Sequence, residues 1–115
     1  MTILALAVAG CGEADDPVEQ LSEVEREGLR IVEEKGCQSC HGAGGRGGAG
    51  PAWIDLAGSE VELDDGSVVI ADRDYLVRAI LDPAAERVVG YNLQMPPNDL
   101  TEVEATAVAA YIEGR

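Results

Sequence analysis

The feature that most constrains this chain is a short motif, Cys37-Gln38-Ser39-Cys40-His41, which has the pattern C-x-x-C-H. This spacing marks the covalent attachment of a c-type haem. At helical spacing, Cys37, Cys40 and His41 share one face of a single turn. The motif therefore predicts a turn that offers two thiols to a porphyrin edge and one imidazole to its iron.

Two other interpretations of the motif are weaker. A tetrahedral zinc site needs about four ligands, and the only other cysteine, Cys11, lies far upstream in the chain. A thioredoxin-like dithiol would need a β-α-β context, and the sequence shows none. Haem attachment is the hypothesis that these comparisons favour.

Length and composition agree with a fold built around a cofactor. The 115 residues suffice for one domain at most. The chain has one tryptophan, three tyrosines and no phenylalanine, so a core made only of its aliphatic side chains would be thin. A buried haem would fill that core with a large apolar body.

The chain is strongly acidic, with 22 Asp and Glu against 8 Lys and Arg and a formal net charge of −14. This balance argues against nucleic-acid binding, which needs clustered Lys and Arg. An acidic surface either steers the protein towards a basic partner at low salt or serves solubility or high-salt adaptation. The sequence leaves these two explanations open.

The start of the chain resembles a bacterial export signal. An uncharged apolar run over residues 3–9 precedes Gly10-Cys11, as in a lipobox whose cysteine is lipidated. The run is too short to span a bilayer, which needs about twenty apolar residues. Because Met1-Thr2 lacks a positive charge, a leader of no consequence is the alternative. We expect residues 1–11 to be a lipoprotein signal peptide ending at Cys11, residues 12–16 a short acidic tether and residues 17–115 one domain that carries a single haem.

The first helix is predicted from its caps and its periodicity. It begins after either Asp16-Pro17 or the capping box that Ser22 opens, and it runs to about Lys35, where Gly36 ends it. Apolar residues at three- and four-residue spacing form its inner stripe. These residues are Leu21, Val24, Gly28, Ile31 and Val32.

A small hairpin is predicted in the middle of the chain. Val61 and Leu63 alternate with polar residues, Asp65-Gly66 favours a tight turn, and residues 68–70 are β-prone. A two-stranded antiparallel hairpin follows from this pattern.

Two further helices are predicted from their caps. Asp72 caps a helix over residues 73–81, and a capping box of Thr101 with Glu104 opens a last helix that Gly114 ends. The segment between these helices is expected to be a loop. The predicted inner residues are Tyr75, Leu76, Ala79 and Ile80 in the first, and Val103, Ala107, Ala110 and Tyr111 in the second.

Met95 is the candidate for the second axial ligand of the iron. It is the only methionine besides Met1, and the two prolines after it would hold its backbone in place. The thioether is a soft ligand, and His/Met ligation raises the reduction potential of a haem. Because His41 is the only histidine, ligation by two histidines of one chain is excluded. The alternative is that Met95 merely fills a gap in a small core.

The residues after the motif are expected to support the haem. The glycine-dense run over residues 42–50 is predicted to fold tightly against a flat cofactor, since a flexible linker there would misplace His41. Pro51 is expected to mark a returning backbone carbonyl that accepts the second ring N–H of His41, or else only to punctuate the loop.

Three polar or aromatic side chains are candidates for the haem pocket. Trp53, Tyr75 and Arg46 carry N–H or O–H groups that could reach the haem propionates. Simple packing is the alternative for each of them.

These parts, in this order, resemble a class I cytochrome c. The segments VELDDGS, ADRDYLVRAILDP and VVGYNLQMPP look more particularly like the cytochrome c domain fused to subunit II of caa3-type cytochrome oxidases, over about residues 24–113. The resemblance implies a mostly α fold, with three main helices around a covalent haem and a small β-hairpin insertion.

The same resemblance assigns roles to individual residues. It implies thioethers from Cys37 and Cys40, His41 as the proximal ligand of the iron and Met95 as the distal one. It also implies that the first and last helices cross where Gly28 and Tyr111 lie.

The function expected from these features is single-electron transfer by one covalently bound haem c, without enzymatic turnover at the iron. We expect a monomeric, lipid-anchored carrier on the periplasmic side or outer face of the cell membrane in a bacterial respiratory chain. It would deliver electrons to a terminal oxidase, with a membrane oxidase or a quinol-oxidising complex as redox partner. The alternatives are a fixed module of a larger oxidase or dehydrogenase complex, and a ligand-binding or sensing haem protein.

Overall fold

The computed structural model describes residues 18–115, which fold into four α-helices, one 3₁₀ turn and one two-stranded sheet. In chain order, the elements are α1 (Glu23–Glu34), α2 (Gln38–His41), η1 (Ala43–Gly45), β1 (Glu60–Glu62), β2 (Val68–Ile70), α3 (Arg73–Leu81) and α4 (Glu102–Glu113). This mostly α architecture with a small hairpin is the predicted fold class. The predicted signal peptide, the acidic tether, Cys11 and the alternative cap at Asp16-Pro17 lie outside the described residues.

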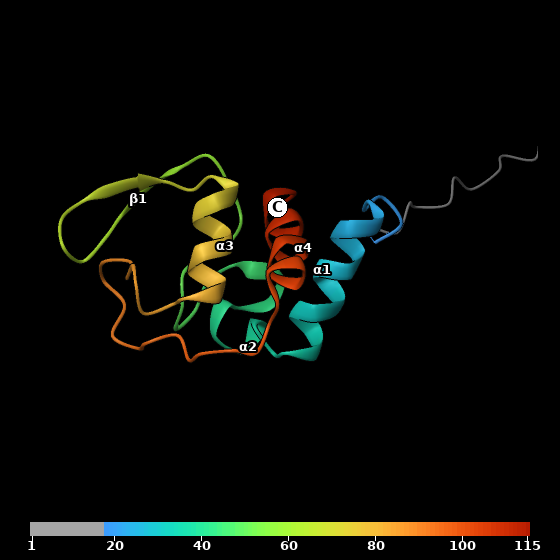
Figure 1. Cartoon of the computed structure of the whole chain (residues 1–115), viewed down its shortest axis with the longest axis horizontal. Helices are drawn as coiled ribbons and strands as arrows, with labels where there is room; N and C mark the ends of the chain where they lie inside the picture. Colours follow the sequence, from blue (N-terminus) through green and yellow to red (C-terminus); the bar gives the residue numbers. More distant parts are fainter. Residues whose placement is uncertain (1–17) are drawn as a thin grey trace, which may run out of the picture.

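Helix α4 lies between α1 and α3 and packs against both (Figure 1). The sequence pattern predicts one apolar stripe on α4, whereas Ala105, Val108, Ala109 and Ile112 are buried in addition to Ala107, Ala110 and Tyr111. A helix covered on two sides buries more than one stripe. The small side chains of α4 therefore let two other helices approach it closely.

Helices α1 and α4 cross at Gly28, as the resemblance implies. A Cβ atom added to Gly28 would lie 2.1 Å from the carbonyl oxygen of Ala107 and 2.8 Å from the Cβ of Tyr111. Such an approach leaves no room for any side chain at this position. The close crossing thus explains a glycine in mid-helix, where it costs about 1 kcal/mol relative to alanine.

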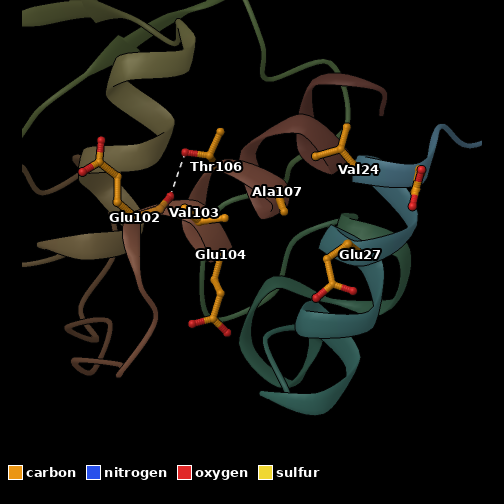
Figure 2. A pocket seen from close by; sticks show the side chains of 8 residues that line it. Val24, Glu27, Glu102, Val103, Glu104, Thr106 and Ala107 are labelled. Carbon is orange, nitrogen blue, oxygen red and sulfur yellow. Dashed lines mark hydrogen bonds between the residues drawn. The ribbon is translucent and has the colours of Figure 1, made fainter.

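The two valines one turn before this crossing are not part of the core. Val24 is 48% exposed and Val103 is 80% exposed, so both predictions of an inward position are wrong. The two valines border a hollow between α1 and α4 (Figure 2). It lies between the Gly28 crossing and the N-terminal ends of the two helices. The hollow is lined by Glu23, Val24, Glu27, Glu102, Val103, Glu104, Thr106 and Ala107.

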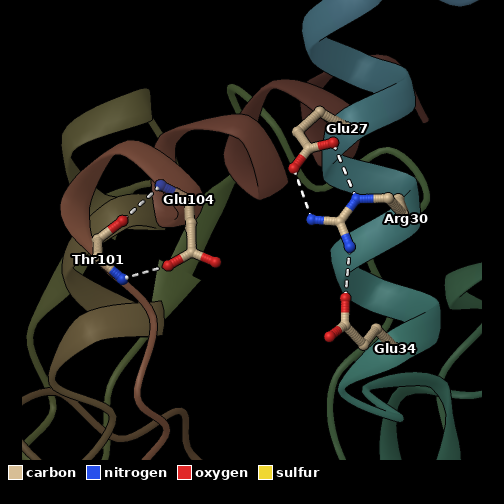
Figure 3. A network of polar contacts seen from close by, with 5 residues as sticks. All are labelled: Glu27, Arg30, Glu34, Thr101 and Glu104. Carbon is tan, nitrogen blue, oxygen red and sulfur yellow. Dashed lines mark hydrogen bonds and ion pairs between the residues drawn. The ribbon is translucent and has the colours of Figure 1, made fainter.

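The two longest helices, α1 and α4, each begin with a capping box, at the second of the two predicted starts for α1 and at the predicted start for α4. At α4, the hydroxyl of Thr101 accepts the backbone N–H of Glu104 at 3.2 Å, and the Glu104 carboxylate accepts the N–H of Thr101 at 3.1 Å (Figure 3). Ser22 and Glu25 make the equivalent pair at α1. Each box satisfies two backbone donors that the first helical turn leaves free.

Gly36 ends α1 and directs the chain into the motif. Its φ of +68° is left-handed, its N–H donates to Glu33, and the N–H of Cys37 donates to the carbonyl of Val32 at 3.1 Å. These two bonds form a Schellman motif, which closes a helix by a glycine in this conformation. The predicted terminating role of Gly36 is confirmed, and it determines where Cys37 begins the next turn.

The predicted hairpin is present between the motif and α3. Its strands pair antiparallel with Val61 opposite Val69, and Gly66 turns the chain with a φ of +86°. Leu63 extends the contact to the segment that leads to Met95, through a bridge to Val88. The hairpin therefore lies against the loop that carries the second candidate ligand.

Helix α3 begins and ends as predicted, with the side chain of Asp72 accepting the N–H of Tyr75 at 2.8 Å. Within the described part of the chain, no helix is long and apolar enough to cross a membrane.

Candidate functional site

The C-x-x-C-H residues lie on one short turn. Cys37 precedes α2, and its carbonyl accepts the N–H groups of Cys40 at 3.3 Å and His41 at 3.1 Å. These bonds place the two cysteines and the histidine at the i, i+3 and i+4 positions of a single turn, as the spacing predicts. The backbone can therefore present two sulfur atoms and one imidazole on one side.

The two thiols are free and differ in their surroundings. Cys37 is half-buried, and this burial raises the pKa of its thiol above the ordinary value. Cys40 is exposed. Among residues 18–115, no group of three or more His, Cys, Asp or Glu side chains is arranged to hold a metal ion. The zinc interpretation of the motif therefore lacks its remaining ligands in the described part of the protein.

The His41 imidazole has the orientation that a metal ligand requires. Its Nδ1 lies 2.7 Å from the backbone carbonyl oxygen of Pro51. Because a carbonyl only accepts, Nδ1 must carry the proton and donate, which leaves the Nε2 lone pair available to a metal. The predicted contact between the loop carbonyl and the imidazole is confirmed, whereas a contact of Pro51 with the haem itself stays a prediction.

The loop after the motif folds back onto the motif. Gly47 donates its N–H to the carbonyl of His41 at 2.7 Å, and Gly50 donates to that of Cys40 at 2.9 Å. A Cβ atom on Gly50 would lie 3.1 Å from Cε1 of the His41 ring. The sequence predicts that this run is rich in glycine because it packs against a flat cofactor. At Gly50 the structure gives a different reason for the glycine, because the backbone there lies against the His41 ring.

Trp53 is buried beside His41. The two ring centroids are 4.9 Å apart with an angle of 29° between the planes, so the rings stack. Tyr75 is also buried, and this burial raises the pKa of its phenol, whereas Arg46 is exposed. The roles of these three side chains towards haem propionates stay predictions. The pair of Trp53 with His41 was missed by the sequence reasoning, because nothing local in a Pro-Ala-Trp segment indicates where the indole lies.

Met95 is half-buried in the segment between α3 and α4. The neighbouring Gln94 donates its side-chain N–H to the carbonyl of Pro83 at 3.1 Å. Asn98 donates its side-chain N–H to the carbonyl of Ile80 at 2.7 Å. These two hydrogen bonds tie both sides of Met95 to the C-terminal end of α3 and the residues just after it.

An ion pair ties the same segment to α1. The ammonium of Lys35 lies 2.9 Å from the carboxylate of Asp99. It raises the pKa of Lys35 and lowers that of Asp99, mainly through this hydrogen bond. Sequence reasoning missed Gln94, Asn98 and Asp99. The cluster Pro-Pro-Asn-Asp only indicates a turn, not the partners of its side chains.

The segment that leads to Met95 carries exposed apolar side chains, as expected of a segment that covers an apolar group. Val89, Tyr91 and Leu93 are exposed although they are apolar or aromatic, and Leu93 is 66% exposed. They alternate along the segment that leads to Met95. Together with the free Nε2 of His41 and the two free thiols, they match the chemistry of a covalently held porphyrin: thioether sulfurs, an imidazole ligand and apolar cover.

The fold is mostly helical and contains one C-x-x-C-H turn, whose own imidazole is hydrogen-bonded to a backbone carbonyl. This is the arrangement of a class I c-type cytochrome. Comparison with family models agrees, since the model of the family named cytochrome c matches residues 25–115. The chain belongs to the cytochrome c family. None of the curated proteins matches it. Its cofactor is accordingly haem c, attached covalently, and its chemistry is haem-based electron transfer.

Proposed function

We propose that the protein is a single-electron carrier whose haem iron is held by His41 and Met95 and whose thioether bonds come from Cys37 and Cys40. The observation that carries this proposal is the 2.7 Å contact between Nδ1 of His41 and the carbonyl oxygen of Pro51. That contact favours the tautomer that leaves Nε2 available to a metal, and hydrogen bonding at the other ring nitrogen raises the basicity of a ligand imidazole.

The opposite axial position is assigned to Met95. It is the only methionine besides Met1, and its segment is held at Gln94, Asn98 and Asp99. Haem c, when bound, would supply one-electron chemistry at its iron, and ligation by His41 and Met95 would place its potential in a high range. The role of the chain is to hold two ligands firmly and to exclude water, so no substrate is transformed at the iron and the protein is not an enzyme.

We assign the electron acceptor to a terminal oxidase of a bacterial respiratory chain. Support comes from the resemblance of about residues 24–113, the hairpin included, to the cytochrome c domain of caa3-type oxidase subunit II. The net charge of −14 favours a partner with a basic docking face. If the charge steers docking, the rate of electron transfer to that partner falls steeply with rising ionic strength; a flat salt dependence contradicts the steering.

The site of action is proposed to be the periplasmic side or outer face of the membrane, with Cys11 carrying a lipid. Support comes from the lipobox-like sequence that ends at Cys11. Detergent phase partition of the full chain against its Cys11→Ser variant tests the anchor. Transfer of the variant to the aqueous phase is expected, and equal partition of both forms contradicts it.

An optical redox titration with and without carbon monoxide tests the ligand assignment. The wild-type reduced spectrum should not change with carbon monoxide at neutral pH, because both axial positions are filled. Met95→Ala should lower the potential and open the iron to carbon monoxide, whereas Asn92→Ala, a change of an exposed polar residue in the same segment, should leave the sixth position closed. An unchanged potential and spectrum in Met95→Ala refute the assignment. A wild-type protein that binds carbon monoxide at once supports a ligand-binding protein instead.

A further inference from the structure

The buried indole of Trp53 stacks on the imidazole of His41. Their centroids are 4.9 Å apart and their planes are inclined by 29°. Trp53 is 5% exposed and is the only tryptophan of the chain. Stacked aromatic rings at such distances attract one another beyond the burial of their surface. The contact thus holds the two rings face to face at this inclination.

Trp53 is itself held from several directions. Its backbone N–H donates to the carbonyl of Gly45 at 2.7 Å. A Cβ atom on Gly45 would lie 2.6 Å from Cε3 of the indole, so the loop backbone packs directly on the ring. The ring of Tyr111, on α4, approaches the indole edge-on at 6.5 Å. Because Tyr111 also contacts Gly28 at the helix crossing, the indole rests on the helical core.

The hydrogen bond to Pro51 alone does not determine the plane of the His41 ring. One hydrogen bond at Nδ1 fixes the position of that nitrogen. The imidazole ring can still tilt about an axis that passes through Nδ1. Contact along one face of the ring opposes this rotation. Trp53 supplies that contact, and the backbone of Gly50 limits movement at Cε1.

We propose that Trp53 is a positioning residue for the axial ligand: it sets the plane of the His41 imidazole and keeps the hydrogen bond to Pro51 short. The inference rests on the proposed role of His41 as an iron ligand. It assigns Trp53 to the histidine, where the sequence alone suggested a contact with haem propionates.

The inference predicts a direction for the reduction potential. A strong Nδ1–H bond to a carbonyl makes the imidazole more basic, and a more basic ligand favours ferric iron. If the ring pivots when the indole is removed, the hydrogen bond to Pro51 weakens. The potential of Trp53→Leu should therefore rise, while Trp53→Phe, which keeps an aromatic face, should stay close to wild type.

The experiment uses holoprotein of the wild type, of Trp53→Leu and of Trp53→Phe. The pattern of haem methyl shifts in the NMR spectrum of the ferric protein reports the plane of the axial imidazole, and a redox titration reports the potential. Leu76→Ala, a truncation of a buried side chain on α3, serves as the control for lost stability. The pattern and the potential should change in Trp53→Leu and be restored in Trp53→Phe, whereas Leu76→Ala should lower the melting temperature alone.

Two outcomes overturn the inference. One is a Trp53→Leu protein with the wild-type methyl pattern and potential. The other, which needs no variant, is the absence of cross-relaxation between the Trp53 and His41 ring protons in the reduced wild-type protein. Failure of the ligand assignment looks different, because the wild type would then show no histidine resonances with strong hyperfine shifts in the ferric state.

Discussion

The two candidate iron ligands lie in regions that are built differently. His41 is on a short helical turn whose backbone is bonded on both sides, and its ring contacts Pro51, Gly50 and Trp53. Met95 is in the segment between α3 and α4, which contains no helix or strand of its own. The side chains that tie this segment down are largely exposed.

The difference indicates which side of the site opens first. Backbone bonds and packed rings open together with the surrounding core, whereas single hydrogen bonds contribute about 0.5–1.5 kcal/mol each, and exposed segments open locally at low free energy. We therefore expect a rigid His41 side and a Met95 side that can detach without global unfolding. The following variants test this contrast, in order of decreasing effect.

Gly28→Leu should have the largest effect, because it destroys the core on which the His41 side rests. Its Cβ would lie 2.1 Å from the Ala107 carbonyl oxygen, and neither helix backbone can move cheaply. We expect a loss of about 3 kcal/mol or more in the free energy of unfolding, measured by urea denaturation. Val24→Leu adds bulk on the exposed side of the same helix and should be neutral. A Gly28→Leu protein of wild-type stability would show that the helices do not cross here.

Gly50→Ala should disturb the His41 side while leaving the helices intact. The new Cβ would lie 3.1 Å from Cε1 of His41, so the ring or the loop must shift. We expect a cost of about 1–2 kcal/mol in the free energy of unfolding and a changed potential. Ala49→Ser, at the exposed neighbouring position, is the control. A stability and potential equal to those of the control would mean that the loop yields without moving the imidazole.

Asn98→Ala should loosen only the Met95 side. It removes the 2.7 Å bond to the carbonyl of Ile80 and the bond that the N–H of Leu100 makes to Asn98. The free energy of unfolding should fall by about 1 kcal/mol, and carbon monoxide should bind the reduced protein several-fold faster. Asn92→Ala, in the same segment, should do neither. Equal acceleration by Gly50→Ala and Asn98→Ala would contradict the contrast between the two sides.

Asp99→Asn should have the smallest effect, and that effect should depend on pH. Lys35 lowers the pKa of Asp99, so the stabilisation is present above the unfolded value of about 3.9 and disappears as the pH falls through the lower folded value. The pKa of Lys35 is raised, so the same stabilisation is lost again as the pH rises through that value. Both groups are exposed, which keeps the contribution small.

The measurement for this pair is the melting temperature as a function of pH. The melting temperature of Asp99→Asn should lie slightly below that of the wild type between about pH 5 and 9 and coincide with it near pH 2. Asp64→Asn removes the same charge in the hairpin turn and serves as the control. A difference between wild type and Asp99→Asn that persists at pH 2 would exclude the ion pair as its cause.

Much of the fold follows from local sequence signals. The capping boxes at Ser22 and Thr101, the cap at Asp72 and the glycines at 36 and 66 mark the ends of helices and the hairpin turn, and the structure places those ends as predicted. Such signals act over a few residues, through backbone groups that must be satisfied on the spot. The C-x-x-C-H turn belongs to the same class, because its spacing alone places three side chains on one face.

Contacts between segments far apart in the chain follow from the folded packing and not from local signals. Helical periodicity predicts buried positions for Val24 and Val103, but both lie one turn before the contact at Gly28 and are exposed. The stacking of Trp53 on His41 and the bond from Asn98 to Ile80 join segments whose local patterns say nothing of each other. The haem-binding turn could be predicted from the amino-acid sequence, since its two cysteines and its histidine lie within five consecutive residues. The plane of the imidazole and the support of Met95 depend on packing between distant segments, and packing is decided only when the whole chain has folded.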